Sequence, residues 1–248
     1  MRRVRLPLAV MVAMITSSAA AHVAPSVDDN NRYIKVSPQA DRLRVAYTVF
    51  FGEVPGQALR PALDADHDGS ISDGEAQSYG DKIAAEVIAA LELAVDGKQQ
   101  AFRWKQVAVG MGSPAVAAGS FSIDMIAYVC FPRAGGKHEA LIRDRYRVPK
   151  PGETEVRVED APGITVSAAR IGGSDALAND FKFVGPGGPL SDEGLKVIFT
   201  ASDKAAVSGE CNNVVAPASS STPWLAIGLG IAALLVGGAL VLRHSLRK

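Results

Sequence analysis

The sequence predicts a mainly β protein: an antiparallel β-sandwich-like domain with an inserted acidic loop and helix, followed by one C-terminal transmembrane helix. Three observations predict this fold class. Short segments alternate apolar and polar residues between turn residues, one stretch has helical periodicity, and one run near the C-terminus is apolar and uncharged. Short, regularly spaced strands separated by Gly/Pro-rich turns are typical of sandwiches.

The first 21 residues have the order of a secretory signal peptide. Arginines precede an apolar run from Leu6 to Ile15, and small residues then continue to Ala21. Cleavage after Ala21 would leave His22 at the mature N-terminus. An N-terminal membrane helix is the alternative, but the apolar run is too short to span a bilayer comfortably. We therefore expect residues 22–215 to form an extracytoplasmic domain.

The last part of the sequence predicts a membrane anchor. Residues 216–223 are small, rich in serine and bounded by proline, as in a flexible linker. Residues 224–242 contain no charged side chain and predict a transmembrane helix, with Trp224 at the outer interface. The basic residues of the tail, 243–248, place it in the cytoplasm and the body of the protein in the periplasm or at the cell surface. A buried soluble helix is the alternative, which the glycines of this run would weaken.

The formal net charge of zero hides an asymmetry. Six of the 26 basic residues lie in the signal peptide and the tail, which leaves 20 basic against 26 acidic residues in the domain. A domain with this acidic excess has no basic footprint for nucleic acid. We therefore expect no nucleic-acid partner.

The two cysteines, Cys130 and Cys211, both fall in the predicted extracytoplasmic domain. Oxidation is permitted in such a compartment, so one disulfide is an alternative to two unpaired thiols. Spacing along the sequence does not decide between them, because a disulfide depends on the distance between the two Cα atoms.

Several segments have the pattern of β-strands. Residues 32–36 and 43–49 alternate apolar and polar side chains around turn residues and predict a β-hairpin. In the second segment Leu43, Val45 and Tyr47 share one face, which we expect to be buried. The further strands expected later in the chain lie at 101–109, 121–131, 141–148, 154–158, 164–169 and 195–200.

One amphipathic helix is expected from Asp73 to Leu93. Apolar side chains recur every four residues from Tyr79 to Leu91, while charged residues occupy other faces. The pair Asp96-Gly97 is a strong turn signal and follows the expected end of this helix.

The twelve residues from Asp64 to Glu75, DADHDGSISDGE, resemble the calcium-binding loop of the EF-hand family. Calcium takes six to eight oxygen ligands, and carboxylates at alternate positions of such a loop converge on it. The expected ligands are the side chains of Asp64, Asp66, Asp68 and Glu75, the carbonyl oxygen of Ser70, and a water molecule held by Ser72.

Three other positions agree with this loop. Gly69 stands where a positive φ is required, Ile71 is expected to pack inward, and His67 stands at a position that contributes no ligand. An acidic surface turn that fits the pattern by chance is the alternative. Agreement at six positions, directly before an amphipathic helix, favours calcium.

The sequence departs from the EF-hand family in two ways. Pro55, Gly56 and Pro61 leave room for little more than one helical turn before the loop, so the inserted EF-hand-like region spans 55–93. EF-hands also act in pairs, and the chain contains no second loop of this kind. A lone loop predicts weak binding, at about 0.1–1 mM as in extracellular calcium modules.

A second resemblance covers the first third of the mature chain. The segments Asn31-Arg32-Tyr33 and Tyr47 to Pro55 (YTVFFGEVP), with His22 before them and the acidic loop after them, are similar to the outer domain of some nickel/cobalt-transporter-like membrane proteins. The multi-helix permease is missing here. The resemblance therefore implies an accessory role near a transporter and excludes transport by this chain alone.

This resemblance also implies a second metal hypothesis. A mature N-terminal His22, with its amine and imidazole, would bind nickel, cobalt or copper, and His138 is the other histidine available to join it. An ordinary exposed terminus is the alternative.

The sequence contains no catalytic signature such as G-x-S-x-G, H-E-x-x-H or a phosphate loop. Asp124 and Glu139 could form a hydrolytic carboxylate pair, but solvated strand faces explain them more simply. We therefore expect a non-enzymatic, membrane-anchored calcium-binding adaptor or accessory module. A nickel-, cobalt- or copper-handling accessory protein is the alternative, and an unrecognised hydrolase is a weaker one.

Overall fold

A computed structural model of the chain describes residues 28–131, 135–172, 179–185, 188–203, 205, 207 and 211. The chain divides into two compact units, residues 1–208 and 209–248, and Cys211 is the only described residue of the second unit. The predicted signal peptide, linker, transmembrane helix and tail lie outside the described residues, as does His22. Among the described residues, no helix combines the length and the apolar character needed to cross a membrane.

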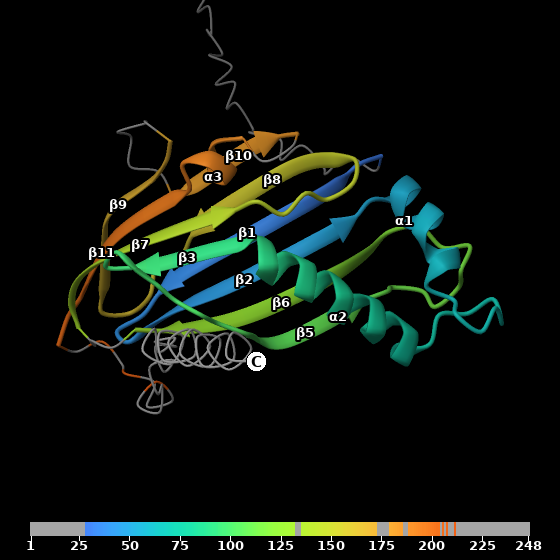
Figure 1. The fold of residues 1–248 in the computed structure, drawn as a ribbon, viewed down its shortest axis with the longest axis horizontal. Coiled ribbons are helices and arrows are strands. Elements are labelled where there is room, and N and C mark those ends of the chain that lie inside the picture. The colour runs from blue at the N-terminus through green and yellow to red at the C-terminus, as the bar shows by residue number, and fades with distance from the viewer. Residues whose placement is uncertain are drawn as a thin grey trace, which may run out of the picture. The chain divides into compact units, whose positions relative to one another are not determined.

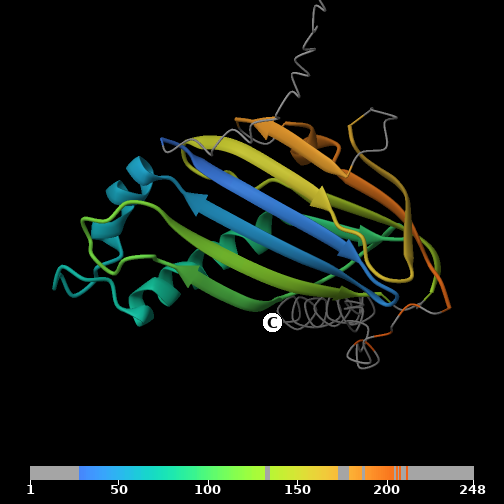
Figure 2. The same ribbon diagram turned by 180° about the vertical axis from the view of Figure 1, so that it is seen from behind.

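The strands form two sheets, as predicted for a mainly β fold (Figures 1 and 2). The first sheet has the order β10 (Asp180–Val184), β8 (Pro151–Val158), β1 (Asn30–Pro38), β2 (Arg42–Phe51), β6 (Phe121–Cys130) and β5 (Trp104–Gly110). The second has the order β4 (Lys98–Gln99), β3 (Leu91–Val95), β7 (Gly136–Asp144), β11 (Leu195–Ala201) and β9 (Ile164–Ile171). Neighbouring strands are antiparallel except β1 and β8, which run parallel.

The larger of two hydrophobic clusters contains buried side chains from both sheets. The predicted hairpin is β1 and β2, which pair along their length. Every second residue of β2 is buried, including Leu43, Val45 and Tyr47 as predicted. The two-residue period of a strand thus places its apolar side chains in the core and its polar side chains on the outer face.

Helical elements lie against both sheets, one on β5 and β6 of the first sheet and one on β7 of the second. The helical elements are α1 (Glu53–Leu59), the 3-10 helix η1 (Arg60–Ala62), α2 (Asp73–Ala90) and α3 (Pro189–Asp192). In Figure 1, α2 runs obliquely across β5 and β6 and leads directly into β3. A glycine, Gly80, permits this close packing, because a Cβ there would come within 2.5 Å of a Val109 methyl group.

The predicted C-terminal boundary of α2 is wrong, whereas the turn predicted after it is present. The helix ends at Ala90 and not at Leu93, because Leu91, Leu93 and Val95 bury alternate side chains in β3 and pair with β7. The predicted turn at Asp96-Gly97 therefore joins two strands, β3 and β4, and both of its residues have positive φ. Leu91 is expected to be buried both in a continued helix and in a strand that begins there. The apolar pattern alone therefore could not show where the helix ends and the strand begins.

Other segments also differ from the prediction. The helical arm before the acidic loop is longer than one turn, since α1 spans seven residues and η1 three more. Pro55 is tolerated because it stands in the first turn of α1, where no intrahelical bond to its nitrogen would form. Strand β7 begins at Gly136 and not at Leu141, and β3, β4 and β10 were not predicted. Both cysteines are disulfide-bonded, so the alternative of two free thiols is wrong.

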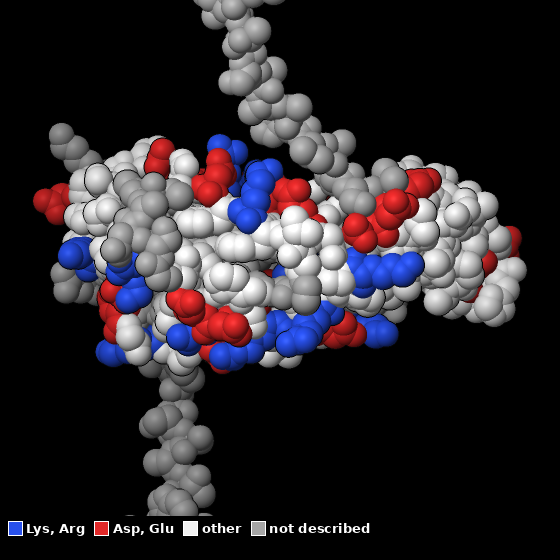
Figure 3. Space-filling model, turned by 90° about the horizontal axis from the view of Figure 1, so that it is seen from above, with Lys and Arg blue, Asp and Glu red and all other residues white. Residues whose placement is uncertain are grey.

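The surface carries both signs of charge. On the face shown in Figure 3, acidic and basic side chains are interspersed among uncharged ones. Some of these charges form ion pairs between β8 and β10, such as those of Lys182 with Glu153 and Glu155. Exposed pairs of this type contribute little to stability.

A buried polar network joins the two sheets. Arg32 of β1 donates hydrogen bonds to Asp144 Oδ2 of β7 (2.7 Å) and to Thr154 Oγ1 of β8 (2.8 Å), and Tyr47 of β2 donates to the same Asp144 oxygen (2.9 Å). All four residues are 2% exposed or less. Burial raises the pKa of Asp144, and the charge of Arg32 acts in the opposite direction. Each charge therefore depends on its partner to remain in the core.

We expect Arg32→Met to lower the free energy of unfolding by about 3–5 kcal/mol, because it leaves Asp144 buried without its cation. Lys35→Met is the matched control on the same strand. Its side chain is 52% exposed, and the surface pair that it forms with Glu159 should contribute less than about 1 kcal/mol. Urea unfolding of both variants measures the difference. Equal losses from the two substitutions would contradict a stabilising role for the buried pair.

Candidate metal centre

The acidic loop lies between η1 and α2, at the same end of the first sheet as α1 (Figure 1). Two apolar side chains, one directly before the loop and one within it, anchor it in the core. Leu63 is 4% exposed and Ile71 is 3% exposed, the latter as predicted. The exposed part of the loop, residues 65–70, therefore lies between two fixed points.

The structure brings the three predicted aspartate ligands together. Carboxylate oxygens of Asp64, Asp66 and Asp68 all lie within 4.8 Å of one another. Asp64 is buried, whereas Asp66 and Asp68 are exposed to solvent. Such a group of oxygens, open on one side, has the chemistry to hold a hard cation.

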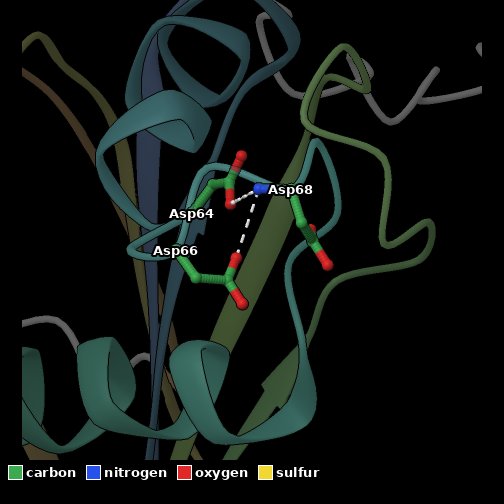
Figure 4. A group of neighbouring side chains, drawn as sticks. All are labelled: Asp64, Asp66 and Asp68. Atoms are coloured by element: carbon green, nitrogen blue, oxygen red, sulfur yellow. Dashed lines mark hydrogen bonds between the residues drawn. The ribbon is translucent and has the colours of Figure 1, made fainter.

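Hydrogen bonds to the loop backbone fix these carboxylates. Asp64 accepts from the amides of Asp68 and Gly69, both at 3.1 Å, through its two oxygens. Asp66 also accepts from the amide of Asp68, at 3.2 Å, so the first two carboxylates converge on one nitrogen (Figure 4). The carboxylate of Asp68 in turn accepts from the amide of Ser70 at 2.8 Å. These hydrogen bonds from backbone amides to aspartate side chains thus hold the loop in a compact conformation.

Two residues of the loop have a left-handed backbone. Gly69 has φ = 88°, as the loop pattern predicts, and a side chain there would be strained. His67 has φ = 60°, a region that histidine tolerates better than most residues. The side chain of His67 is exposed, as expected for a position that provides no ligand.

Glu75, in the first turn of α2, reaches back to the start of the loop. Its Oε1 accepts from the amide of Ala65 at 2.6 Å, while its Oε2 accepts from the amide and the hydroxyl of Ser72, both at 2.8 Å. These bonds, first of all those from Ser72, lower the pKa of Glu75 from 4.5 to about 2. The last predicted ligand is therefore held ionised on the side of the loop where the aspartates begin.

Ser72 has a role that the loop pattern did not predict. Its hydroxyl accepts from the amide of Glu75 and it is the N-cap of α2, so the two residues form a capping box. The spacing Ser-x-x-Glu is a recognisable signal for this arrangement. The predicted water held by Ser72 remains a prediction.

The loop also pairs with a segment far away in the sequence. Ser70 and Ala115 form an isolated antiparallel β-bridge, although Ala115 lies in the connection between β5 and β6. Arg60 of η1, which is fully buried, donates five hydrogen bonds to carbonyl oxygens of the same connection. Sequence reasoning missed both features, because neither residue type indicates such a contact.

A groove of about 540 Å³ opens beside the loop. One wall contains Ile71, Asp73 and Ala76, and the other contains Val109 and Met111. The groove thus lies between the residues that follow the acidic loop and the strand and connection that face them.

Other candidate residues do not assemble into a site. Asp124 and Glu139 are exposed on strands of different sheets, so the structure does not bring this pair together. His138 is 1% exposed, and its two ring nitrogens contact Asp96 Oδ2 (2.8 Å) and the carbonyl oxygen of Gly135 (2.9 Å). Both nitrogens of His138 are therefore engaged within the protein.

Comparisons of the sequence with protein families and with curated proteins find no match. The metal preference of the centre is therefore inferred from the residues that form it. All six predicted ligand positions lie in the loop or in the first turn of α2, and every donor among them is oxygen. Such a donor set fits calcium or magnesium better than nickel or copper, which favour nitrogen.

The lowered pKa of Glu75 predicts a specific acid sensitivity. Ionised Glu75 contributes stability above pH 4.5, and this contribution is lost as the pH falls towards its folded value of about 2. We expect the difference in melting temperature between the unmodified protein and Glu75→Gln, measured in EDTA, to be largest above pH 4.5 and to shrink towards pH 2.

Asp73→Asn is the control for this experiment, because it removes the same charge from the same helical turn. This variant keeps Glu75 and its hydrogen bonds, so it should retain the acid sensitivity that we assign to Glu75. A melting-temperature difference for Glu75→Gln that stays constant across the range would contradict the assigned hydrogen bonds.

Proposed function

We propose that this chain is a membrane-anchored, extracytoplasmic calcium-binding protein that acts as a non-enzymatic adaptor or accessory module. The convergence of Asp64, Asp66 and Asp68 within 4.8 Å carries the proposal. This convergence occurs in a loop that matches the EF-hand pattern and leads into a capped helix. The sequence patterns of a signal peptide and a C-terminal anchor support the location.

Calcium is the cation that this set of oxygens suits best. It accepts six to eight oxygens in a flexible shell, whereas magnesium requires a near-octahedral shell and retains several waters. The ligands would be Asp64, Asp66, Asp68, the carbonyl of Ser70 and Glu75, with a water near Ser72. Asp66 and Asp68 remain exposed, so the cation can enter from solvent.

A structural role for calcium follows from the position of the loop. The loop joins η1, in which Arg60 is fully buried, to α2, which buries Ile83 and Val87 in the core. A ligand at ten times its dissociation constant stabilises a folded protein by about 1.4 kcal/mol, which is enough to keep such a region ordered. Millimolar calcium outside the cell would suit the weak binding expected of a lone loop.

The accessory role near a transporter rests on the resemblance of the first third of the mature chain. The alternative, binding of nickel, cobalt or copper through His22, would require its amine and imidazole together with further ligands. His138 does not supply such a ligand in the present conformation, because both of its ring nitrogens are engaged. Calcium binding is therefore the better-supported function.

Calorimetric titration of the purified full-length chain with calcium tests the proposal. We expect one saturable site with a dissociation constant of about 0.1–1 mM. Calcium at ten times this constant should raise the melting temperature by about 3–6 °C. Glu75→Gln should weaken binding by about tenfold or more, since it removes a charged bidentate ligand.

Asp73→Asn is again the matched control, because Asp73 lies in the same turn but at a position that provides no ligand. Its calcium affinity should stay close to that of the unmodified protein. Absence of heat and of any thermal shift at several millimolar calcium would overturn the proposal, and saturable binding of nickel with none of calcium would favour the alternative.

A further inference from the structure

The connection between β5 and β6, residues 111–120, lies against the middle of the acidic loop. The amide of Ile71 donates to the carbonyl of Pro114 at 2.7 Å, and the amide of Val116 donates to the carbonyl of Gly69 at 3.3 Å. These two bonds flank the bridge between Ser70 and Ala115. The backbone on both sides of Ser70 is therefore held by the connection.

The geometry of this bridge determines where the carbonyl of Ser70 points. Ser70 and Ala115 are directly opposite but exchange no hydrogen bond, because both bonds come from their neighbours. In such an antiparallel pair, the N–H and C=O groups of the paired residue point away from the partner strand. The amide of Ser70 accordingly meets Asp68 Oδ1 at 2.8 Å, so its carbonyl faces the side of the aspartates.

The connection is itself fixed by Arg60. The guanidinium group is fully buried, and burial lowers its pKa while the charge of Glu53 acts in the opposite direction. Its hydrogen bonds reach five carbonyl oxygens, those of Met111 (2.6 Å), Ser113 (2.8 Å), Ala115 (3.0 Å), Gly119 (2.8 Å) and Ser120 (3.1 Å). All five donor positions of an arginine can be used in this way. The connection cannot move away without leaving a buried cation unsatisfied.

Helix α1 adds two further contacts to the connection. Glu53 Oε2 accepts from the amide of Ser120 at 3.0 Å. Gly56 lies so close that a Cβ there would come within 2.6 Å of the carbonyl oxygen of Gly119. The elements before the acidic loop thus hold the connection, and the connection holds the loop.

We propose that the connection is the second half of the metal centre: its backbone positions the carbonyl of Ser70 as a ligand, and Arg60 is the positioning residue that keeps the connection in place. The inference rests on the proposed binding of calcium. Coupling of this kind is reciprocal, so calcium also stabilises the pairing between the loop and the connection.

Val116→Pro tests this role directly, because it removes the amide that donates to Gly69. Val116 is the second residue of a β-turn closed by the amide of Ala118 on the carbonyl of Ala115 (3.0 Å), a position that favours proline. Ala115 is extended in the bridge, as a residue before proline prefers. Val116→Ala is the matched control, since it shortens the side chain and keeps the amide.

Calorimetry should show a calcium affinity about 3- to 10-fold weaker for Val116→Pro than for Val116→Ala, the factor expected for one hydrogen bond made in the ligating conformation. The difference in melting temperature between the two variants should be larger in calcium than in EDTA, whereas a purely structural role predicts the same difference in both. Equal affinities would overturn the inference and leave calcium binding intact. Absence of binding by the unmodified protein would overturn both.

Hydrogen exchange of the unmodified full-length chain decides the question if Val116→Pro does not fold. At ten times its dissociation constant, calcium should slow exchange of the Ile71 and Val116 amides by about tenfold through suppression of local opening. The amide of Gln100, bonded to the carbonyl of Leu93 in the β3–β4 hairpin, should change less. Unchanged exchange at Ile71 and Val116, in protein that binds calcium, would also overturn the inference.

Discussion

One buried guanidinium group constrains the end of the molecule that carries the metal centre. Arg60 belongs to the short helix before the acidic loop, yet the five hydrogen bonds of its guanidinium group go to the connection more than fifty residues later. A buried cation is expensive unless its donors are satisfied, so the helical arm and the connection must remain together. Because the loop begins four residues after Arg60 and pairs with the same connection, its conformation depends on this contact.

The acidic loop combines two opposing effects. Hydrogen bonds from the loop backbone bring three carboxylates within 4.8 Å, although like charges at this separation repel each other. A divalent cation would replace this repulsion by attraction without a large rearrangement, since the backbone already has the required turn. Electrostatic repulsion and a preformed backbone together explain why the loop suits a cation and why binding would increase order.

The two metal hypotheses differ in how much structure supports them. The calcium hypothesis uses a loop whose carboxylates accept hydrogen bonds from its own backbone. The hypothesis based on His22 concerns a residue outside the described part of the chain, and the second histidine proposed for it is buried between Phe131 and Phe199 with both nitrogens engaged. The difference favours calcium on physical grounds and not on resemblance alone.

Sequence patterns predicted those features of the fold that residues close together in the chain determine. The alternation in β2 gave its buried face, and the loop sequence gave the positive φ of Gly69, the burial of Ile71 and the convergence of the aspartates. The end of α2 could not be predicted because Leu91 satisfies both a helical and a strand period, and pairing with β7 decides between them.

Long-range contacts account for what sequence reasoning missed at the site. Arginine is expected at the surface, and the burial of Arg60 depends on carbonyl groups contributed by a distant turn. The pairing of Ser70 with Ala115 likewise leaves no trace in residue type, since backbone groups make it. The acidic loop, for which the sequence offers no second loop of its kind, thus pairs with a connection that carries no metal-binding motif.

A crystal structure of the protein grown with calcium, with anomalous diffraction data, would show whether the acidic loop holds the ion. We expect an anomalous peak inside the loop, with oxygens of Asp64, Asp66, Asp68 and Glu75 and the carbonyl oxygen of Ser70 at about 2.3–2.6 Å. The bonds between the loop and the connection should persist in that structure. A loop without a peak at saturating calcium, or a peak whose ligands exclude Ser70 and Glu75, would contradict the proposed calcium site.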